Sequence, residues 1–461
     1  MLEETIVETG LESQPKSCIL SLPLFKERVD SFFIILIITT SSLILIISLK
    51  LRIFHLWVDF LHSTSFLRII TYPFLISTAI IIAGIVFRTI LWFRYKPFMV
   101  ESGEELIWPY VSVIMPALNE EELIESSIDS VFTSNYPQDK LEVICINDGS
   151  TDSTLFKMMK AKQKYGEKLR VIKFSKNLGK RRALYVAVKK SKGEIIVTVD
   201  TDSRIERNAI MNLVVPLIKD KNTGAVAGRV EVLNERENFL TRMLSIRYSI
   251  SFNFGRAYQS VCGAVFCCPG ALTAYRKRIL KKFIEEWVSQ KFLNIPCTYG
   301  EDRALTTQIL KAGFLTRFQS NALVYTKVPS KFSQMNKMYL RWTRSCIRES
   351  ILFSKFMFTG YRKKHRVSPI LDFFFLNFLH PFHIFSFGIL IYSFFIHPLF
   401  IFRHLAFLVI VSFFLSLYYL RANKSPVFLY GIPYAIIAAF CLCWIVPFAA
   451  CTMKNQSWLT R

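Results

Sequence analysis

The chain alternates between long, uniformly apolar runs and stretches in which apolar and polar residues are mixed. Four runs, at residues 32–49, 69–93, 370–396 and 400–420, are each long enough to cross about 30 Å of hydrocarbon as a helix. Between residues 100 and 328 such runs stop, and short β-branched segments alternate with segments of helical period. The pattern predicts two membrane helices, a soluble α/β domain, and then further membrane helices.

The mixed region opens with segments that predict a mostly parallel sheet. The runs YVSVIMPALNE, LEVICINDGSTD, LRVIKFS and EIIVTVDTDS read as strands, and EELIESSIDSVFTS between the first two reads as an amphipathic helix. In such sheets, ligands bind beyond the carboxyl ends of the strands. The polar residues expected at these ends are Asn119, Glu120, Asp148, Asp200 and Asp202.

The rest of the chain is organised around this domain. We expect a cytoplasmic tail and two membrane helices in residues 1–98, the α/β domain in 99–330, basic and aromatic interfacial helices in 331–366, and C-terminal membrane helices in 367–461. Residues 428–451 are apolar but are interrupted by two prolines and followed by basic residues. Because positive charge favours the cytoplasmic side, we expect this run to be re-entrant or interfacial rather than spanning.

Composition supports a membrane protein. Hydrophobic residues make up 52% of the chain, and the formal net charge is +24. Lys and Arg beside apolar spans are typical of cytoplasmic flanks that face anionic lipid headgroups, so nucleic acid is not an expected partner. The 10 cysteines show no paired spacing typical of zinc sites or disulfide frameworks. We therefore expect an integral membrane protein with a cytoplasmic α/β domain and reduced, buried thiols.

The segment VDTDS places Asp200 and Asp202 at the end of an apolar strand. Side chains two residues apart on a strand point the same way, so the two carboxylates should face one ligand. Hard oxygen ligands of this kind suit Mg²⁺ or Mn²⁺ carrying a diphosphate. An acidic turn without a metal is the alternative.

Two other loops could hold the organic parts of such a ligand. Asp148, in NDGS, follows a buried-type strand and could accept hydrogen bonds from a base or a ribose, or could form only an Asx-turn. The segment NLGKRRA offers a glycine with Lys180 and Arg181, as diphosphate binding requires, or could be a solvated basic turn. It lacks the pattern of a phosphate-binding loop of ATPases.

Two further elements suggest group transfer. Glu301 and Asp302 stand just before a helix in GEDRALTTQILKAG, where a carboxylate can be a cap or a general base that takes a proton from an acceptor hydroxyl. Arg341 and Trp342 offer a cation for a phosphate and a flat indole for a sugar ring. The alternative for this pair is an anchor at the membrane interface.

Taken in order, VSVIMPALNE, INDGSTD, NLGKRRAL, VDTDS, GEDRALT and RWTRS resemble the inverting family 2 glycosyltransferases that make β-linked polysaccharides. The branch to which the chain is most similar contains hyaluronan synthases and bacterial chitin-oligomer synthases. The segments FGRAYQSVCGAVFCCPGALTAYRK and RWTRSCIRES carry that likeness in particular. The resemblance implies a GT-A glycosyltransferase domain between transmembrane and interfacial helices.

The resemblance also implies a role for each site residue. Substrate binding would involve Ala117, with Glu120 and Asp148 at the uridine and Lys180 and Arg181 at the diphosphate. Asp200 and Asp202 would serve the metal, Asp302 would be the catalytic base, and Arg341 and Trp342 would lie near the diphosphate and acceptor. The tail from Trp458 to Arg461, WLTR, looks like the W-G-T-R element that closes over the nucleotide. One position departs from the family: Met338 stands where its Q-x-x-R-W motif has glutamine.

The implied function is processive transfer of an amino sugar from UDP-GlcNAc, possibly alternating with UDP-GlcA, to a growing polysaccharide that is exported across the membrane. The expected partners are a UDP-sugar, the polysaccharide and membrane lipids, with Mg²⁺ or Mn²⁺ as cofactor. A non-processive enzyme that glycosylates a lipid would share the nucleotide site without needing Arg341 and Trp342. A transport or scaffold protein is a third reading, which the intact aspartates disfavour.

Overall fold

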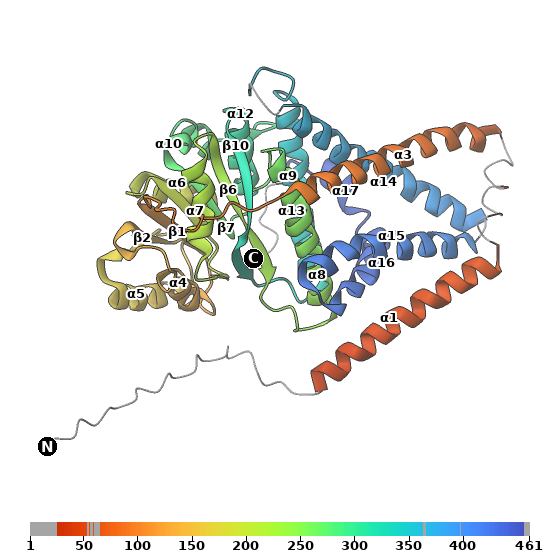
Figure 1. The fold of residues 1–461 in the computed structure, drawn as a ribbon, viewed down its shortest axis with the longest axis horizontal. Coiled ribbons are helices and arrows are strands. Elements are labelled where there is room, and N and C mark those ends of the chain that lie inside the picture. Colours follow the sequence, from red (N-terminus) through yellow and green to blue (C-terminus); the bar gives the residue numbers. More distant parts are fainter. Residues whose placement is uncertain are drawn as a thin grey trace.

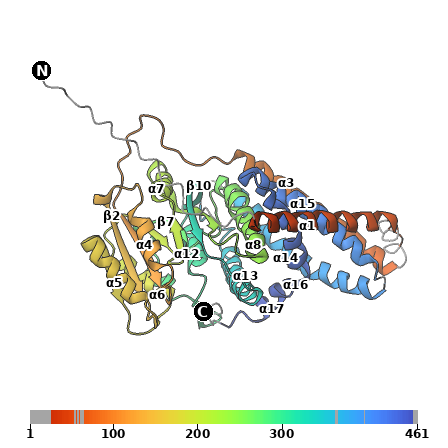
Figure 2. The same ribbon diagram turned by 90° about the horizontal axis from the view of Figure 1, so that it is seen from below.

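The computed structural model describes residues 25–52, 55, 59, 65–362, 366–396 and 398–455. A sheet with helices packed on it forms one part of the molecule, and a set of long helices extends away from it (Figure 1). The view turned by 90° shows the same two parts side by side (Figure 2). The observed order of elements confirms the predicted α/β domain between groups of helices.

The main sheet has eight strands in the order β3-β2-β1-β4-β7-β6-β10-β5. Its first half is parallel throughout, with β2 between β3 and β1, and β4 on the other side of β1. Its second half is mixed, because β7 runs antiparallel to both β4 and β6, whereas β10 is parallel to β6 and antiparallel to β5. The strand bounds are β1 Val111–Ala117, β2 Leu141–Asn147, β3 Leu169–Lys173, β4 Ile195–Val199, β5 Ser203–Ile205, β6 Thr223–Val232, β7 Leu272–Arg276 and β10 Leu315–Thr326.

The central strands are buried along their whole length because helices cover both faces of the sheet. Every residue of β1, β2 and β4 is buried, as expected for parallel strands packed on two sides. Helix α4 (Ile124–Phe132) shows the matching pattern, since Ile124, Ile128 and Val131 form one buried stripe. The other helices of this part are α5 Thr154–Tyr165, α6 Lys180–Lys190, α7 Ala209–Lys219, α8 Phe239–Ser249, the π-helix η3 Ile250–Arg256, α9 Ala257–Val261, α10 Lys277–Leu280, α11 Ile284–Val288 and α12 Glu301–Lys311. A two-stranded ribbon, β8 Lys291–Phe292 with β9 Ile295–Pro296, precedes α12.

The long helices are α1 (Phe25–Lys50), α3 (Ser65–Arg94), α14 (Val367–Ile396) and α15 (Phe400–Asn423). Among the described residues, two segments are long and apolar enough to cross a membrane, Phe32–Lys50 and Ile401–Asn423. Residues 69–93 and 370–396 lie in helices of 30 residues each, but many of their side chains lie outside the described part, so spanning by these two stays a prediction.

The basic segment after the sheet forms one helix, α13 (Phe332–Ser354), rather than several. The last apolar run forms a 3-10 turn, η4 (Pro426–Tyr430), followed by α16 (Gly431–Cys441) and α17 (Ile445–Cys451). Helices η4 to α16 and α17 meet at a bend of 45°, which suits either a broken span or a re-entrant loop. Helix α17 packs against α13, so this run returns towards the sheet domain.

Helices α3 and α14 are joined by a buried ion pair. Arg88 Nε lies 2.9 Å from Asp372 Oδ1. The second oxygen, Oδ2, accepts a hydrogen bond of 3.2 Å from Gln259 Nε2 of α9, which belongs to the sheet domain. The pair therefore ties two of the long helices to each other and to the sheet domain.

Candidate active site

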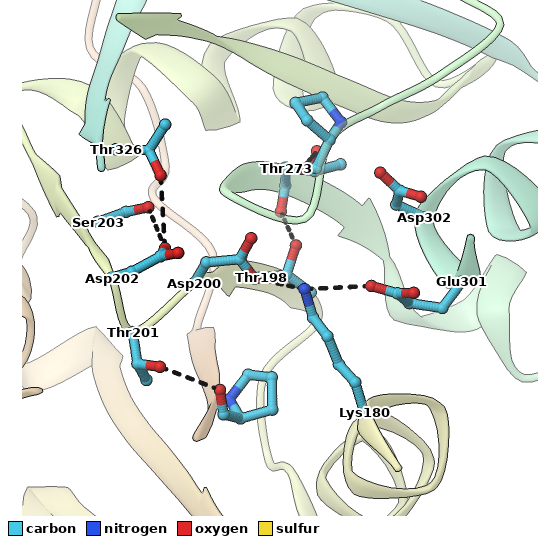
Figure 3. Close-up of polar contacts among 12 residues, drawn as sticks. Lys180, Thr198, Asp200, Thr201, Asp202, Ser203, Thr273, Glu301, Asp302 and Thr326 are labelled. Atoms are coloured by element: carbon cyan, nitrogen blue, oxygen red, sulfur yellow. Dashed lines mark hydrogen bonds and ion pairs between the residues drawn. The ribbon is translucent and has the colours of Figure 1, made fainter. Parts of the chain in front are cut away.

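Three acidic side chains gather around Lys180 beyond the ends of the central strands (Figure 3). The Lys180 Nζ lies 2.5 Å from Asp200 Oδ1 and 3.1 Å from Glu301 Oε1. Asp302, the next residue on α12, lies within electrostatic reach of the same amine. The cluster thus combines the first turn of α6, the residue after β4 and the first turn of α12.

Glycines at two helix starts make this arrangement possible. Gly179 precedes α6 with φ of 88°, and Gly300 precedes α12 with φ of 69°, both in the left-handed region that favours glycine. A Cβ on Gly300 would also lie 2.5 Å from Ser345 Cβ, so only glycine lets α12 start this close to α13. That close packing brings Glu301 and Asp302 to the cluster.

Charge and burial shift the pKa values in this cluster in opposite directions. Burial lowers the pKa of Lys180, but the negative charges of Asp200 and Glu301 outweigh it and raise the pKa. Burial raises the pKa of Asp302, and the neighbouring charge of Glu301 raises it further. Burial opposes ionisation of Glu301 as well, yet Lys180 and Arg341 hold its pKa below the usual range. One lysine is therefore shared among carboxylates, and of the neighbours Glu301 and Asp302 it is Asp302 that takes up a proton more readily.

Asp202 has partners different from those of Asp200. Strand β4 ends at Val199, so both aspartates lie in the turn before β5, and the prediction that strand alternation aligns them is wrong. The Asp202 Oδ1 atom accepts from Ser203 Oγ at 3.0 Å and Thr326 Oγ1 at 3.4 Å, whereas Asp200 contacts Lys180 (Figure 3). The physical reason is that β10 pairs with β5 and brings Thr326 beside the turn.

The predicted nucleotide-binding residues lie at the ends of β1 and β2. The Asp148 N–H donates to the carbonyl of Ala117 at 2.9 Å, and the Glu120 N–H donates to Thr154 Oγ1 at 2.8 Å. The Asp148 carboxylate accepts from the backbone N–H groups of Leu178 (2.7 Å) and Gly179 (3.0 Å). Asp148 thus links the loop after β2 to the loop that carries Lys180, and this contact positions the lysine.

The structure brings Lys180 to the carboxylates but not Arg181. Successive residues of a helix point about 100° apart, so the two side chains leave α6 in different directions. The Arg181 guanidinium is buried beside α11, where Nη1 donates to the Trp287 carbonyl at 2.6 Å and to Gln290 Oε1 at 2.8 Å. Its placement is that of a residue that holds α6 against α11.

Asp302 is also flanked by the loop before β7. The Cys267 Sγ–H donates to Asp302 Oδ2 at 3.7 Å, and the Arg303 N–H donates to Oδ1 at 2.7 Å. In the same loop, a Cβ on Gly270 would lie 2.8 Å from Lys180 Nζ and 3.2 Å from Asp200 Oδ1. The sequence indicates Glu301 only as a cap or base beside Asp302, and it does not indicate Cys267 or Gly270 as site residues, although both lie in a segment that carries the resemblance.

The Arg341 and Trp342 pair lies on α13 beside the cluster. The charge of Arg341 acts on Glu301 and on Tyr248, and burial raises the pKa of Tyr248 with the charge of Asp202 adding to it. The indole of Trp342 is 39% exposed, with its centroid 6.0 Å from the ring of Tyr248 and 5.7 Å from that of Tyr339. A half-open aromatic surface thus adjoins the carboxylates. Met338, in place of the expected glutamine, accepts from the Tyr248 hydroxyl through Sδ at 3.9 Å.

Trp458 and Arg461 lie outside the described residues. The chain just before them contacts the start of α12 and the helix α13. The Tyr299 hydroxyl, before α12, donates to the Asn455 carbonyl at 2.9 Å, and Arg344 Nη2 of α13 donates to Thr452 Oγ1 at 2.8 Å. Tyr299 immediately precedes Gly300, so Asn455 is held close to the site.

The donor set fits a divalent cation that completes its shell with substrate. Within the described residues, no group of three or more His, Cys, Asp or Glu side chains could hold a metal alone. Mg²⁺ and Mn²⁺ at phosphate sites typically take one or two protein carboxylates and draw the remaining ligands from phosphate and water. Asp200 and Asp202 can supply those carboxylates.

Comparison with known proteins agrees with this chemistry. Residues 112–284 match the family model for glycosyl transferase family 2. The chain is 32% identical over 252 residues to an N-acetylglucosaminyltransferase of Mesorhizobium japonicum, a match that covers 54% of this chain and 58% of the relative. An N-acetylglucosaminyltransferase of Rhizobium meliloti is 33% identical over 245 residues, covering 53% and 57% of the two chains. The chain thus spans somewhat more than half the length of these relatives.

Among solved structures, a mannosyltransferase from Pyrobaculum calidifontis, in complex with GDP-mannose and Mn²⁺, aligns with a TM-score of 0.52 at 22% identity, covering 79% of this chain and 98% of that one. This likeness shows the fold. Residues 112–284 are therefore similar to family 2 glycosyltransferases, and they lie in an α/β domain of the GT-A-like fold with apolar helices before and after it.

Proposed function

We propose that the protein transfers N-acetylglucosamine from UDP-GlcNAc to a growing β-linked polysaccharide, with a divalent cation as cofactor. The names of the relatives support the sugar, since both are N-acetylglucosaminyltransferases. The Mn²⁺ and sugar nucleotide of the mannosyltransferase structure, which shares the fold, support the cation. The observation that carries the proposal is the placement of Lys180, Asp200 and Glu301 next to Asp302 at the ends of the strands of a glycosyltransferase domain.

The reaction divides among these residues. Asp302 accepts the proton of an acceptor hydroxyl, whose oxygen attacks the anomeric carbon of the donor while the bond to UDP breaks on the opposite side. The raised pKa of Asp302 makes it a stronger base than an exposed aspartate. Lys180 and Arg341 place positive charge where the diphosphate leaves. A cation held by Asp200 and Asp202 would neutralise further charge on that diphosphate.

The acceptor would lie on the aromatic surface of α13. A processive enzyme holds the growing end while the donor is exchanged, and the exposed face of Trp342 can bind a sugar ring without fixing one hydrogen-bond register. The apolar helices would then pass the polymer across the membrane. The contacts of Asn455 and Thr452 support closure of the WLTR tail over the nucleotide from the cytoplasmic side, as a re-entrant run at 428–451 would require.

A donor assay tests the proposal. Purified protein in lipid vesicles would receive radiolabelled UDP-GlcNAc, with and without UDP-GlcA, in Mg²⁺, in Mn²⁺ and in excess chelator, and the product would be sized. We expect a long polymer that needs the cation and is absent for Asp202→Asn, because a neutral amide is a poor ligand for a hard cation. Asp139→Asn, at an exposed aspartate of the 3-10 turn before β2, is the matched control and should behave as wild type. Full turnover in excess chelator would show that the reaction needs no divalent cation. A singly glycosylated lipid as the sole product would show that the enzyme glycosylates a lipid and does not make a polymer.

A further inference from the structure

A groove lies between the ends of α3 and α15 that adjoin the sheet domain. Its volume is about 330 Å³, and it is lined by Trp92, Phe93, Phe414, Leu417, Tyr418 and Arg421. On α15 the lining residues recur three and four positions apart, so they form one face of that helix. Phe93 and Phe414 are 59% and 62% exposed, which shows that the groove opens to the outside of the helix bundle.

Arg421 gives the groove one charged end. Its guanidinium carbon lies 5.0 Å from the ring centroid of Trp92 and 4.6 Å from that of Phe93. Within the described residues, no carboxylate lies within 4.0 Å of Arg421, and its side chain is exposed at the last turn of α15. Contact with the two rings restrains the guanidinium, and its exposed N–H groups can donate to a phosphate.

The position of Arg421 along α15 indicates which layer of a membrane surrounds it. Ile401–Asn423 is one of the two described segments that can cross a membrane, and Arg421 is two residues from its end. A cation at this depth lies at the level of the lipid phosphates, and the apolar residues Phe414 and Leu417, further along the helix, lie at the level of acyl chains. The order of charge and apolar surface therefore matches that of a phospholipid.

The wall of the groove is attached to the glycosyltransferase domain. The Trp92 Nε1–H donates to the Asn253 carbonyl in η3 at 2.6 Å. The ring of Tyr418 stacks on that of Phe254, also in η3, with centroids 4.2 Å apart. A molecule in the groove would thus stabilise the contact between the two helix ends and the π-helix of the domain.

We infer that this groove binds one anionic glycerophospholipid, with the phosphate on Arg421 and an acyl chain along Phe414 and Leu417. The inference rests on the membrane placement proposed above and not on the sugar-transfer chemistry. An anionic headgroup is favoured over a zwitterionic one because no acidic side chain of the described residues is within ion-pair distance of Arg421 to offset its charge or to meet a choline.

The test compares the full-length protein in nanodiscs of phosphatidylcholine alone and of phosphatidylcholine with phosphatidylglycerol. Native mass spectrometry counts retained phosphatidylglycerol, and thermal unfolding reports stabilisation. We expect one retained lipid and a higher melting temperature in the mixed discs. Arg421→Gln should weaken retention by about fivefold, as loss of one basic contact to an anionic lipid predicts. Lys424→Gln removes an equal charge one residue beyond α15, outside the groove, and should retain the lipid.

A second variant tests the apolar part of the groove independently of the charge of Arg421. Leu417→Trp fills the apolar part and keeps Arg421, so it should also lose the lipid if the acyl chain enters the groove. Equal losses for Lys424→Gln and Arg421→Gln would show diffuse attraction to the membrane and overturn the site. Inorganic phosphate that raises the melting temperature as much as the lipid does would show a soluble anion site instead. Donor turnover measured on the same discs keeps a failure of the lipid site distinct from a failure of the proposed enzyme activity.

Discussion

Two ion-pair clusters in this molecule use the same chemistry in different surroundings. At Lys180, the side chains of the lysine, Asp200 and Glu301 are 21%, 28% and 7% exposed, and the one amine contacts both carboxylates. At Arg88 and Asp372, one cation meets one anion, and their side chains are only 9% and 1% exposed. In the first cluster, which is partly open, one lysine is shared by two carboxylates. In the second cluster, which is closed, one cation pairs with one anion.

The difference indicates what each cluster does. A balanced buried pair keeps helices in register but offers nothing to a ligand. A partly open cluster whose lysine is shared between carboxylates can exchange one of its internal contacts for a cation and a diphosphate. The raised pKa of Asp302 follows first from burial and then from the charge of Glu301. Substitutions in the Lys180 cluster should therefore change the reaction rate. Substitutions in the Arg88–Asp372 pair should change the stability of the protein.

The largest effect is expected at Asp302. Replacing it with asparagine removes the base, so the transfer rate should fall by about 10²–10⁴-fold while UDP-sugar binding is retained. Radiolabel incorporation measures the first, and calorimetric titration with UDP the second. An unchanged transfer rate would exclude Asp302 from the mechanism.

At Asp372 the effect should be on stability. Asp372→Asn leaves the buried guanidinium of Arg88 without its counter-charge, which costs about 3–5 kcal/mol when a buried pair is broken. The double variant Arg88→Leu with Asp372→Leu removes both charges and should recover most of that loss. Thermal unfolding in detergent measures both variants. If the single and double variants unfold at the same temperature, the charges of Arg88 and Asp372 add nothing to stability beyond the packing of their side chains.

Trp342→Ala should act on product length rather than on donor use. The loss of one aromatic contact to the sugar weakens the hold on the acceptor by roughly five- to tenfold, in line with about 1 kcal/mol for an aromatic contact. Gel sizing should then show shorter chains, while hydrolysis of UDP-GlcNAc to UDP survives better than elongation because Asp302 and Lys180 remain. Chains of normal length would show that the indole is only an interfacial anchor.

The smallest effect concerns pH. As the pH falls, activity should be lost when Asp302 is protonated, and because its folded pKa is raised, this acidic limb of kcat/KM should lie above that of an ordinary aspartate. Glu301→Gln removes the like charge and leaves Lys180 with fewer anions, so both changes lower the pKa of Asp302. The acidic limb should move to lower pH. Movement in the opposite direction would mean that another group titrates.

Much of the fold follows from the sequence because local pattern determines it. The buried strands β1, β2 and β4, the amphipathic α4 and the polar residues at the strand ends lie where the pattern placed them. The order of β7, β6, β10 and β5 does not follow, because it depends on pairings between strands far apart in the chain.

The site shows the same limit. The contact of Thr326 with Asp202 joins residues 124 positions apart, and no local pattern indicates it. The direction of Arg181 depends on the rotation of α6 against α11, and the pairing of Arg88 with Asp372 depends on how two apolar runs pack. The resemblance supplied the residue types, and three-dimensional packing decided which of them face the cluster.

Binding of Mn²⁺ together with UDP is the most direct test of the claim that the cluster at Lys180 is a cation and diphosphate site. Electron paramagnetic resonance would count Mn²⁺ bound to purified protein in the presence of UDP, for wild type, Asp200→Asn, Asp202→Asn and the Arg88→Leu, Asp372→Leu double variant. We predict one bound Mn²⁺ per chain in wild type and in the double variant, and loss of that ion in both aspartate variants at the cluster. Equal Mn²⁺ binding by all four proteins would show that the cluster at Lys180 is not the cation site.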